Sequence, residues 1–273
     1  MNLRLQLKLF LRSFFLQAGW NFAKYQNLGF TFIMLPFLRQ LYKDDPEALP
    51  GVMQRYLDTF NTNPVMASFC FGALAKQEEA IVKKQSLTDY KEQVMEWNGI
   101  RRGLSITAAS IGDRLFWGTL KPLTLLLAIF IWMLLGINFF ETHLLQTVPD
   151  ADVYIAIIAA FVVYNAIAWY VRWKGLRIAY DSNEATCFGL TYFDWNRIIY
   201  HLKRAGFLFT AFLLLFGVYR YFSQMPYHDL YFMSRAVLVV FFVMLSFVTR
   251  RLRIPNVYLY IIAVITFSVA CIF

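Results

Sequence analysis

Long apolar runs dominate the second half of the chain. Residues 123–140 and 153–171 hold almost no charged side chain, and each approaches the roughly 20 residues that a helix needs to cross a membrane. Shorter apolar runs follow at 207–219 and 236–248, and another occupies residues 257–273. The pattern predicts an all-α integral membrane protein with about five transmembrane helices.

The N-terminal residues follow a different, amphipathic pattern. Arg4, Lys8 and Arg12 fall on one helical stripe. The apolar residues near another stripe are Leu3, Leu7, Phe10, Leu11, Phe14 and Phe15. Such a helix lies in the plane of the membrane interface, with its apolar side chains in the lipid and its cations near the headgroups. The start alternates basic and apolar residues without a continuous apolar core, so no cleavable signal peptide is expected.

Two short apolar runs follow, at 28–38 and 65–75. Runs of this length are too short to span and predict buried core helices or re-entrant segments. Each run has Asn and Pro within or beside it, a pattern typical of the broken helices that form binding sites in transporters. We therefore predict two regions: amphipathic, re-entrant and cytoplasmic helices at 1–122, and a transmembrane helical domain at 123–273.

A stretch of mixed charge, residues 76–97, separates the second short run from the spans. It predicts a solvated cytoplasmic helix or helical hairpin. Glu78 and Glu79 stand on this stretch, where we expect them to face water or a partner. Further along, residues 141–152 contain no Lys or Arg, whereas 172–204 contain six, so the first segment is expected outside and the second inside.

Composition agrees with a membrane protein. Hydrophobic residues make up 59% of the chain and charged residues 16%, against about 25% charged in soluble domains. The net charge of +9 comes from basic residues that often flank apolar runs, so membrane topology accounts for it and nucleic-acid binding is not expected. The three scattered cysteines argue against a disulfide framework and a zinc site.

One carboxylate stands close to the apolar part of the chain. Asp113 has Arg114 as its only charged neighbour in SITAASIGDRLFWGT. Acids at such positions are costly and often functional, and this one could accept hydrogen bonds from a sugar hydroxyl or from a re-entrant backbone. The alternatives are an ion pair with a nearby cation, or an N-cap ahead of the 123–140 span.

Two groups of uncharged polar residues could also contact a sugar. Asn61 and Thr62 begin a polar turn with Asn63, where amides and hydroxyls could bind a neutral polyol or simply cap the following helix. Gln17, Trp20 and Asn21 place two amides and an aromatic ring within about one helical turn. The same residues could instead be an interface anchor and a cap.

Signatures of covalent or metal-dependent catalysis are missing from the sequence. The three histidines are far apart, and no Ser–His–Asp arrangement, HExxH, P-loop or GxGxxG pattern occurs. We therefore expect no catalytic residue, no metal and no cofactor. The residues favour the hypothesis of a membrane protein that binds or conducts a small polar molecule.

Three sequence blocks resemble a known family. They are LRSFFLQAGWNFAKYQNLGF at 11–30, FNTNP at 60–64 and GDRLFWGTLKP at 112–122. In this order they are similar to the IID component of the mannose/fructose/sorbose class of the bacterial phosphoenolpyruvate-dependent sugar phosphotransferase system. The similarity covers about residues 11–122, and beyond it only length and hydropathy are alike.

The resemblance implies a membrane subunit without a phosphohistidine. Such a IID subunit pairs with a IIC subunit in the bacterial cytoplasmic membrane, and the pairs assemble as a trimer. A mannose-type hexose crosses between them and is phosphorylated by IIB, with IIA upstream. By position, the residues that the resemblance implies for the sugar path and its supporting turns are Gln17, Trp20, Asn21, Asn61, Thr62, Asp113 and Trp117.

The chain also departs from the family pattern. Ala23 replaces an acid, Arg114 a proline, and Ile106, Thr107 and Ser110 replace Gly, Pro and Gly. Because β-branched residues favour regular structure, these changes support a second hypothesis: a divergent relative that does not transport and acts as a structural or regulatory membrane partner. A broken hairpin at 104–120 would favour transport. A continuous helix with Asp113 in an ion pair and no cavity would favour the second hypothesis.

Overall fold

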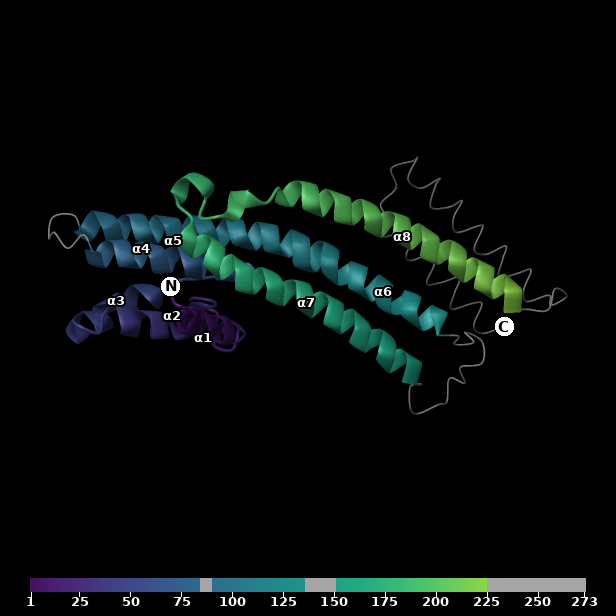
Figure 1. The fold of residues 1–273 in the computed structure, drawn as a ribbon, viewed down its shortest axis with the longest axis horizontal. Coiled ribbons are helices and arrows are strands. Elements are labelled where there is room, and N and C mark those ends of the chain that lie inside the picture. Colours follow the sequence, from purple (N-terminus) through teal and green to yellow (C-terminus); the bar gives the residue numbers. More distant parts are fainter. Residues whose placement is uncertain (84–89, 136–150, 225–273) are drawn as a thin grey trace. The chain divides into compact units, whose positions relative to one another are not determined.

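A computed structural model describes residues 1–83, 90–135 and 151–224 of the chain (Figure 1). The described residues are helical and contain no β-sheet, only two isolated bridges. Residues 1–213 form one compact unit, and residues 214–224 belong to a second. The elements, in chain order, are α1 Leu3–Ser13, α2 Asn27–Leu41, η1 Pro46–Ala48, α3 Leu49–Tyr56, α4 Ala67–Lys83, α5 Tyr90–Gly112, η2 Asp113–Leu120, α6 Lys121–Leu134, α7 Ala151–Asp181, η3 Glu184–Thr186, η4 Leu190–Tyr192 and α8 Trp195–Gln224.

Three helical segments are long and apolar enough to cross a membrane. They are Tyr90–Leu134, Ala151–Asp181 and Trp195–Arg220. The first joins α5, the π-helix η2 and α6 without a break, and it runs through residue 122, where we placed the division into two regions. These segments contain the described helical residues of the first three predicted spans, at 123–140, 153–171 and 207–219. The predicted spans at 236–248 and 257–273 lie outside the described residues.

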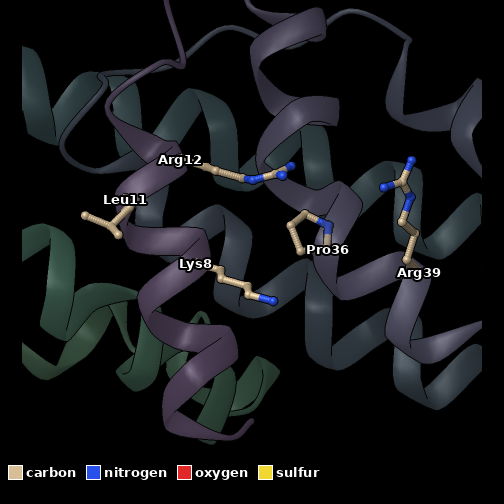
Figure 2. Close-up of a pocket in the computed structure, with 5 residues that line it drawn as sticks. All are labelled: Lys8, Leu11, Arg12, Pro36 and Arg39. Carbon is tan, nitrogen blue, oxygen red and sulfur yellow. The ribbon is translucent and has the colours of Figure 1, made fainter.

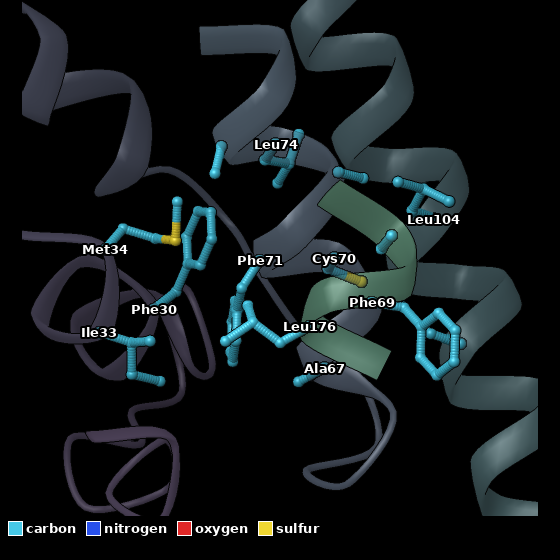
Figure 3. Packing of buried hydrophobic residues seen from close by; sticks show 14 of the residues in the cluster. Phe30, Ile33, Met34, Ala67, Phe69, Cys70, Phe71, Leu74, Leu104 and Leu176 are labelled. Carbon is cyan, nitrogen blue, oxygen red and sulfur yellow. The ribbon is translucent and has the colours of Figure 1, made fainter. Parts of the chain in front are cut away.

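Helices α2 and α4 form the centre of the hydrophobic core. Phe30, Ile33 and Met34 of α2 meet the side chains of α4, with Leu104 of α5 and Leu176 of α7 beside them (Figure 3). The expected break within these helices is not found, because each apolar run forms one continuous helix. The interruptions lie in the loops that precede α2 and α4.

Close contact between α4 and α7 depends on small residues. A side chain at Gly72 of α4 would overlap the carbonyl of Leu176 on α7, and one at Gly175 would overlap Ser68 of α4. The absence of Cβ atoms lets the two backbones approach each other directly, as in the small-residue contacts of membrane helices. The long helix α7 is thereby packed against the core that carries the family blocks.

Helix α1 has one buried and one exposed apolar face. Leu5 and Leu9 point into the core, whereas Leu3, Leu7 and Leu11 are 66%, 46% and 54% exposed. The amphipathic helix is therefore present, and Asn2 caps it by accepting a hydrogen bond from the Leu5 amide at 2.8 Å. Its exposed leucine stripe is available to a membrane surface.

The described parts of the charged stretch 76–97 lie on α4 and α5, two helices that pack against each other, and the first acid of the stretch is buried. Glu78 has no exposed surface. It accepts hydrogen bonds from the hydroxyls of Tyr42 at 2.7 Å and Tyr56 at 2.9 Å, and it is paired with the guanidinium of Arg55. The expectation that Glu78 faces water or a partner is wrong, because three distant side chains supply the donors that a buried carboxylate needs.

Candidate functional site

The loops before α2 and α4 are joined by backbone hydrogen bonds. The amide of Gln26 donates to the carbonyl of Phe60 at 2.8 Å, and the amide of Phe60 donates to Lys24 at 3.3 Å. Two side chains of the second loop, Thr62 and Asn63, then reach the helix 90–134. We call this group the polar junction; its members are Asn21, Gln26, Asn27, Thr62, Asn63 and Asp113.

Thr62 is held on all of its polar atoms. Gln26 donates to the Thr62 carbonyl and accepts from the Thr62 amide, both at 3.0 Å, and the Thr62 hydroxyl donates to the carbonyl of Ser105 at 2.9 Å. Thr62 is 4% exposed and Gln26 is 2% exposed. Buried polar groups need such partners, so Thr62 fixes the second loop between α2 and α5.

Asn63 connects the second family block to the third. Its side-chain amide donates to a carboxylate oxygen of Asp113 at 3.0 Å, and its carbonyl oxygen accepts from the amide of Val65 at 3.1 Å. A side chain at Gly112 would overlap Asn63, so only glycine allows this close approach. Asn63 thus stabilises the turn that precedes α4 and also bonds the long helix 90–134.

Asp113 lies within the long helix, at the first residue of η2, and its side chain is exposed. The alternative that Asp113 is an N-cap ahead of the span is wrong, because the helix is continuous on both sides of it. Among the described residues Asp113 forms no ion pair. Its observed partner is the neutral amide of Asn63.

Asn21 holds the turn of the first loop. Its side-chain amide donates to the side-chain oxygen of Asn27 at 2.8 Å, and its own oxygen accepts from the backbone amide of Lys24 at 2.9 Å. Asn27 in turn donates to the carbonyl of Leu57 at 2.8 Å. These bonds hold a loop turn and cap no helix, since α2 has Gln26 at its N-cap and no side-chain cap bond. Residues 14–26 form turns, whereas the sequence places Gln17, Trp20 and Asn21 on one helical turn.

The remaining predicted site residues lie outside this network. Trp20 is 46% exposed and packs edge-on against Phe22, with ring centroids 4.9 Å apart. Gln17 and Asn61 are exposed, as is Trp117 at 53%. Asn21, Thr62 and Asp113 therefore each bond a different buried amide of the junction, which is Asn27, Gln26 or Asn63. The other four predicted side chains are exposed.

Gln26 and Asn27 are both buried in the junction, and neither is among the site residues predicted from the sequence. A local signal was present, since both amides stand directly before the apolar run 28–38. Amides at the edge of a core must find partners or pay a desolvation cost. Their partners are the second loop's backbone groups and the side chain of Asn21, none of which a sequence pattern identifies.

Three features would favour the non-transporting hypothesis: a continuous helix, an ion pair of Asp113 and no cavity. The segment 104–120 shows the first of them. It is a continuous helix, in which Thr107 bonds the Gly103 carbonyl at 2.9 Å and Ile106 is 69% exposed. The broken hairpin is therefore absent. The ion pair of Asp113 that the same hypothesis requires is absent within the described residues. The helix also widens into a π-helix at Asp113–Leu120, a feature often found at functional sites.

A family model for the "PTS system mannose/fructose/sorbose family IID component" matches residues 4–140, about half of the chain. The chain belongs to this family. The mannose-specific EIID component of Escherichia coli K12 is 39% identical over 113 residues, which are 41% of this chain and 38% of that protein. The sorbose-specific EIID component of Klebsiella pneumoniae is 30% identical over 174 residues, 64% of this chain and 55% of that protein.

Aligned segments thus cover between about two fifths and just over half of these relatives. Two solved structures share the fold of the IID chain. One, titled "Structure of membrane protein", is 26% identical with a TM-score of 0.61 and covers 78% of this chain and 70% of its own. The other is the mannose transporter ManYZ in complex with microcin E492. Its matching chain is 20% identical with a TM-score of 0.54, and the match covers 99% of this chain and 96% of that chain. The predicted family and the all-α membrane fold are confirmed.

Proposed function

We propose that this IID chain is a membrane subunit of a sugar-transporting phosphotransferase permease. It forms, with a IIC subunit, the path of a mannose-type hexose that IIB phosphorylates. The observation that carries the proposal is the hydrogen bond between Asn63 and Asp113. It joins the family blocks 60–64 and 112–122, which are distant in sequence, at the edge of a π-helix.

The residues of the site divide into supporting and contacting groups. Asn21 and Thr62 have their polar atoms engaged within the protein, so they position the two loops. Asp113, Asn61 and Trp117 are exposed. A carboxylate and an amide can bind sugar hydroxyls, and an indole ring can pack on the C–H face of a hexose. Gln17 and Trp20 offer the same chemistry from the first loop.

The proposed setting is the bacterial cytoplasmic membrane, with a multi-pass chain. The three apolar helices provide the spans, and the exposed polar side chains need a second subunit to enclose a sugar. The implied partners are IIC in the membrane and the soluble IIA and IIB phosphocarriers, with IIC–IID pairs assembled as a trimer. The family resemblance supports these partners.

The test is sugar uptake by the chain co-expressed with the IIC encoded nearest to it, in cells that carry the matching IIA and IIB. Asp113→Asn and Asn61→Ala should each lower uptake of labelled mannose at least tenfold, while the IIC complex still forms. A tenfold loss corresponds to about 1.4 kcal/mol of interaction free energy. Asp44→Asn is the matched control, because Asp44 is an exposed acid far from the junction. Uptake unchanged by both site variants would contradict the site. A stable complex without uptake in the unmodified chain would contradict transport.

A further inference from the structure

A basic pocket lies between α1 and α2. It has a volume of about 430 Å³ and is lined by Lys8, Leu11, Arg12, Pro36 and Arg39. Lys8 and Arg12 extend from α1 toward Pro36 on α2, and Arg39 lies one turn further along α2 (Figure 2). None of these residues belongs to the polar junction, so the pocket is a separate feature of the fold.

The positive charge of this basic pocket is not neutralised by the described part of the chain. No ion pair there includes Lys8, Arg12 or Arg39. Arg12 donates to the carbonyl of Phe32 at 2.8 Å and lies over the Phe32 ring, 4.4 Å from its centroid. That carbonyl lacks its helical donor because Pro36 has no N–H. Arg12 is thus held in place, and the exposed Lys8 and Arg39 remain able to bind an anion.

An exposed apolar stripe adjoins the pocket. Leu3, Leu7 and Leu11 follow one another at intervals of one helical turn, and Leu11 also lines the pocket. A free phosphate would need the cations alone. A ligand with a phosphate and a hydrocarbon chain would also cover the leucines, which are otherwise exposed to solvent.

The position of α1 matches the level of lipid headgroups. Helix α1 packs against α7 where the apolar run 153–171 ends: Phe10 contacts Trp173 with ring centroids 5.2 Å apart, and Arg172 donates to the Ser13 carbonyl at 2.6 Å. Tryptophan and arginine at the end of an apolar span mark the membrane interface. The positive residues there correspond to the inner surface, where anionic lipids attract basic side chains.

We propose that the basic pocket binds the phosphate of an anionic phospholipid such as phosphatidylglycerol. Lys8 and Arg39 contact the phosphate, Arg12 closes the inner side, and an acyl chain lies along the leucine stripe of α1. The lipid thereby fixes α1 and α2 at the membrane surface. This proposal is independent of sugar transport, since it concerns neither the polar junction nor the path of the hexose.

The test measures binding of fluorescent phosphatidylglycerol to the full-length chain in a non-ionic detergent. Binding should be saturable and at least tenfold tighter than that of phosphatidylcholine. Lys8→Gln with Arg39→Gln should weaken it by about 25-fold, because each cation near an anionic lipid contributes about a factor of five. Lys91→Gln with Arg102→Gln removes the same charge from exposed positions of α5, and this control should bind normally.

Several results would overturn the proposal. Equal binding by the pocket variant and the unmodified chain would do so, as would an equal loss in the α5 control. Full competition by inorganic phosphate or glycerol phosphate at the lipid's own concentration would assign the pocket to a soluble phosphate instead. Folding of each variant is checked by its helical circular dichroism.

A second measurement needs no variant. Acetylation of Lys8 in the unmodified chain, read by mass spectrometry, should slow at least tenfold in nanodiscs that contain phosphatidylglycerol, while acetylation of Lys91 should not change. Equal protection of Lys8 in pure phosphatidylcholine would contradict a site for an anionic headgroup. Protection that requires a second membrane subunit, with or without anionic lipid, would assign this face to protein docking.

Discussion

The side-chain amide of Asn63 donates to the carboxylate of Asp113 at 3.0 Å, across fifty positions of the sequence. The same Asn63 side chain accepts from the amide of Val65, in the turn that precedes α4. The side chain of one buried residue thus accepts from a loop amide just before α4 and bonds the carboxylate of a second, much longer helix. The two family blocks at 60–64 and 112–122 are a single structural unit for this reason.

Replacement of Asn63 should therefore be more harmful than replacement of Asp113. Asn63→Ala removes a hydrogen bond to a charged group and a capping acceptor, which together contribute about 2–4 kcal/mol. Asp113→Asn keeps an oxygen that can still accept from Asn63 and should cost under about 1 kcal/mol. Chemical unfolding in detergent measures both. Asn98→Ala, whose amide bonds the Val94 carbonyl of its own helix, serves as the control, and equal losses in all three would refute the connecting role.

The buried carboxylate of Glu78 should be essential for stability. Glu78→Ala leaves the guanidinium of Arg55 without its anion in a site that is largely closed to water, and breaking a buried pair costs about 3–5 kcal/mol. The neighbouring Glu79 is a matched control, because it is only partly buried and bonds the hydroxyl of Tyr180 at 2.6 Å. Glu79→Ala should cost under about half as much. Melting of the purified chain in detergent measures the two variants, and similar melting temperatures would contradict the prediction.

The same cluster predicts a loss of stability at high pH. Burial and the nearby Glu78 carboxylate raise the pKa values of the Tyr42 and Tyr56 hydroxyls above their usual value. A tyrosine whose pKa is higher in the folded than in the unfolded chain contributes stability at pH values below its unfolded pKa, which is near 10. This contribution to the free energy of unfolding falls as the pH rises beyond about 10. Unfolding free energies measured from neutral pH to about pH 11 should show the fall.

Tyr42→Phe isolates this effect from the titration of lysines. It removes one of the shifted hydroxyls, so the variant should be less stable at neutral pH and should lose less stability on going to high pH. The Tyr42 hydroxyl bonds Glu78 at 2.7 Å, and its deletion costs about 1.5–3 kcal/mol, as for other bonds to charged groups. A pH profile parallel to that of the unmodified chain would contradict the assignment.

Two glycines give opposite predictions. Gly72→Ala would bring a Cβ onto the Leu176 carbonyl of α7, and separating α4 from α7 should cost about 1–3 kcal/mol. Gly103→Ala meets nothing within 4 Å and lies inside α5, so it should stabilise the chain by about 0.5–1 kcal/mol. Thermal unfolding of both variants measures the difference in sign. Destabilisation by both would show that helix contact at Gly72 is not the cause.

Part of this structure could be predicted from sequence because the relevant signals are local. The span at 153–171 follows from an uninterrupted apolar run, and α1 follows from the alternation of leucines with Arg4, Lys8 and Arg12. The stripe of α1 that packs inward could not be predicted, because Leu5 and Leu9 on one side are as apolar as Leu3 and Leu7 on the other.

Other features depend on partners distant in sequence. Glu78 reads as solvated on a charged helix, but Tyr42 lies thirty-six positions away and Arg55 twenty-three. The candidate site depends on distant partners in the same way. The sequence predicts Thr62 and Asn21 as possible sugar contacts, whereas in the structure their side chains bond Ser105 and Asn27. The roles proposed for Asn61, Asp113 and Trp117 stay predictions.

The contact of Arg12 with α2 offers a test of how the chain compensates for a proline. Pro36 cannot donate to the Phe32 carbonyl, and Arg12 supplies the donor at 2.8 Å instead. Arg12→Met should cost about 0.5–1.5 kcal/mol in the unmodified chain. In a Pro36→Ala background the new backbone amide can bond the Phe32 carbonyl, so the same Arg12→Met change should cost much less. Unfolding free energies of the four chains give the coupling between the two positions. A coupling indistinguishable from zero would mean that Arg12 is held by its contact with the Phe32 ring alone.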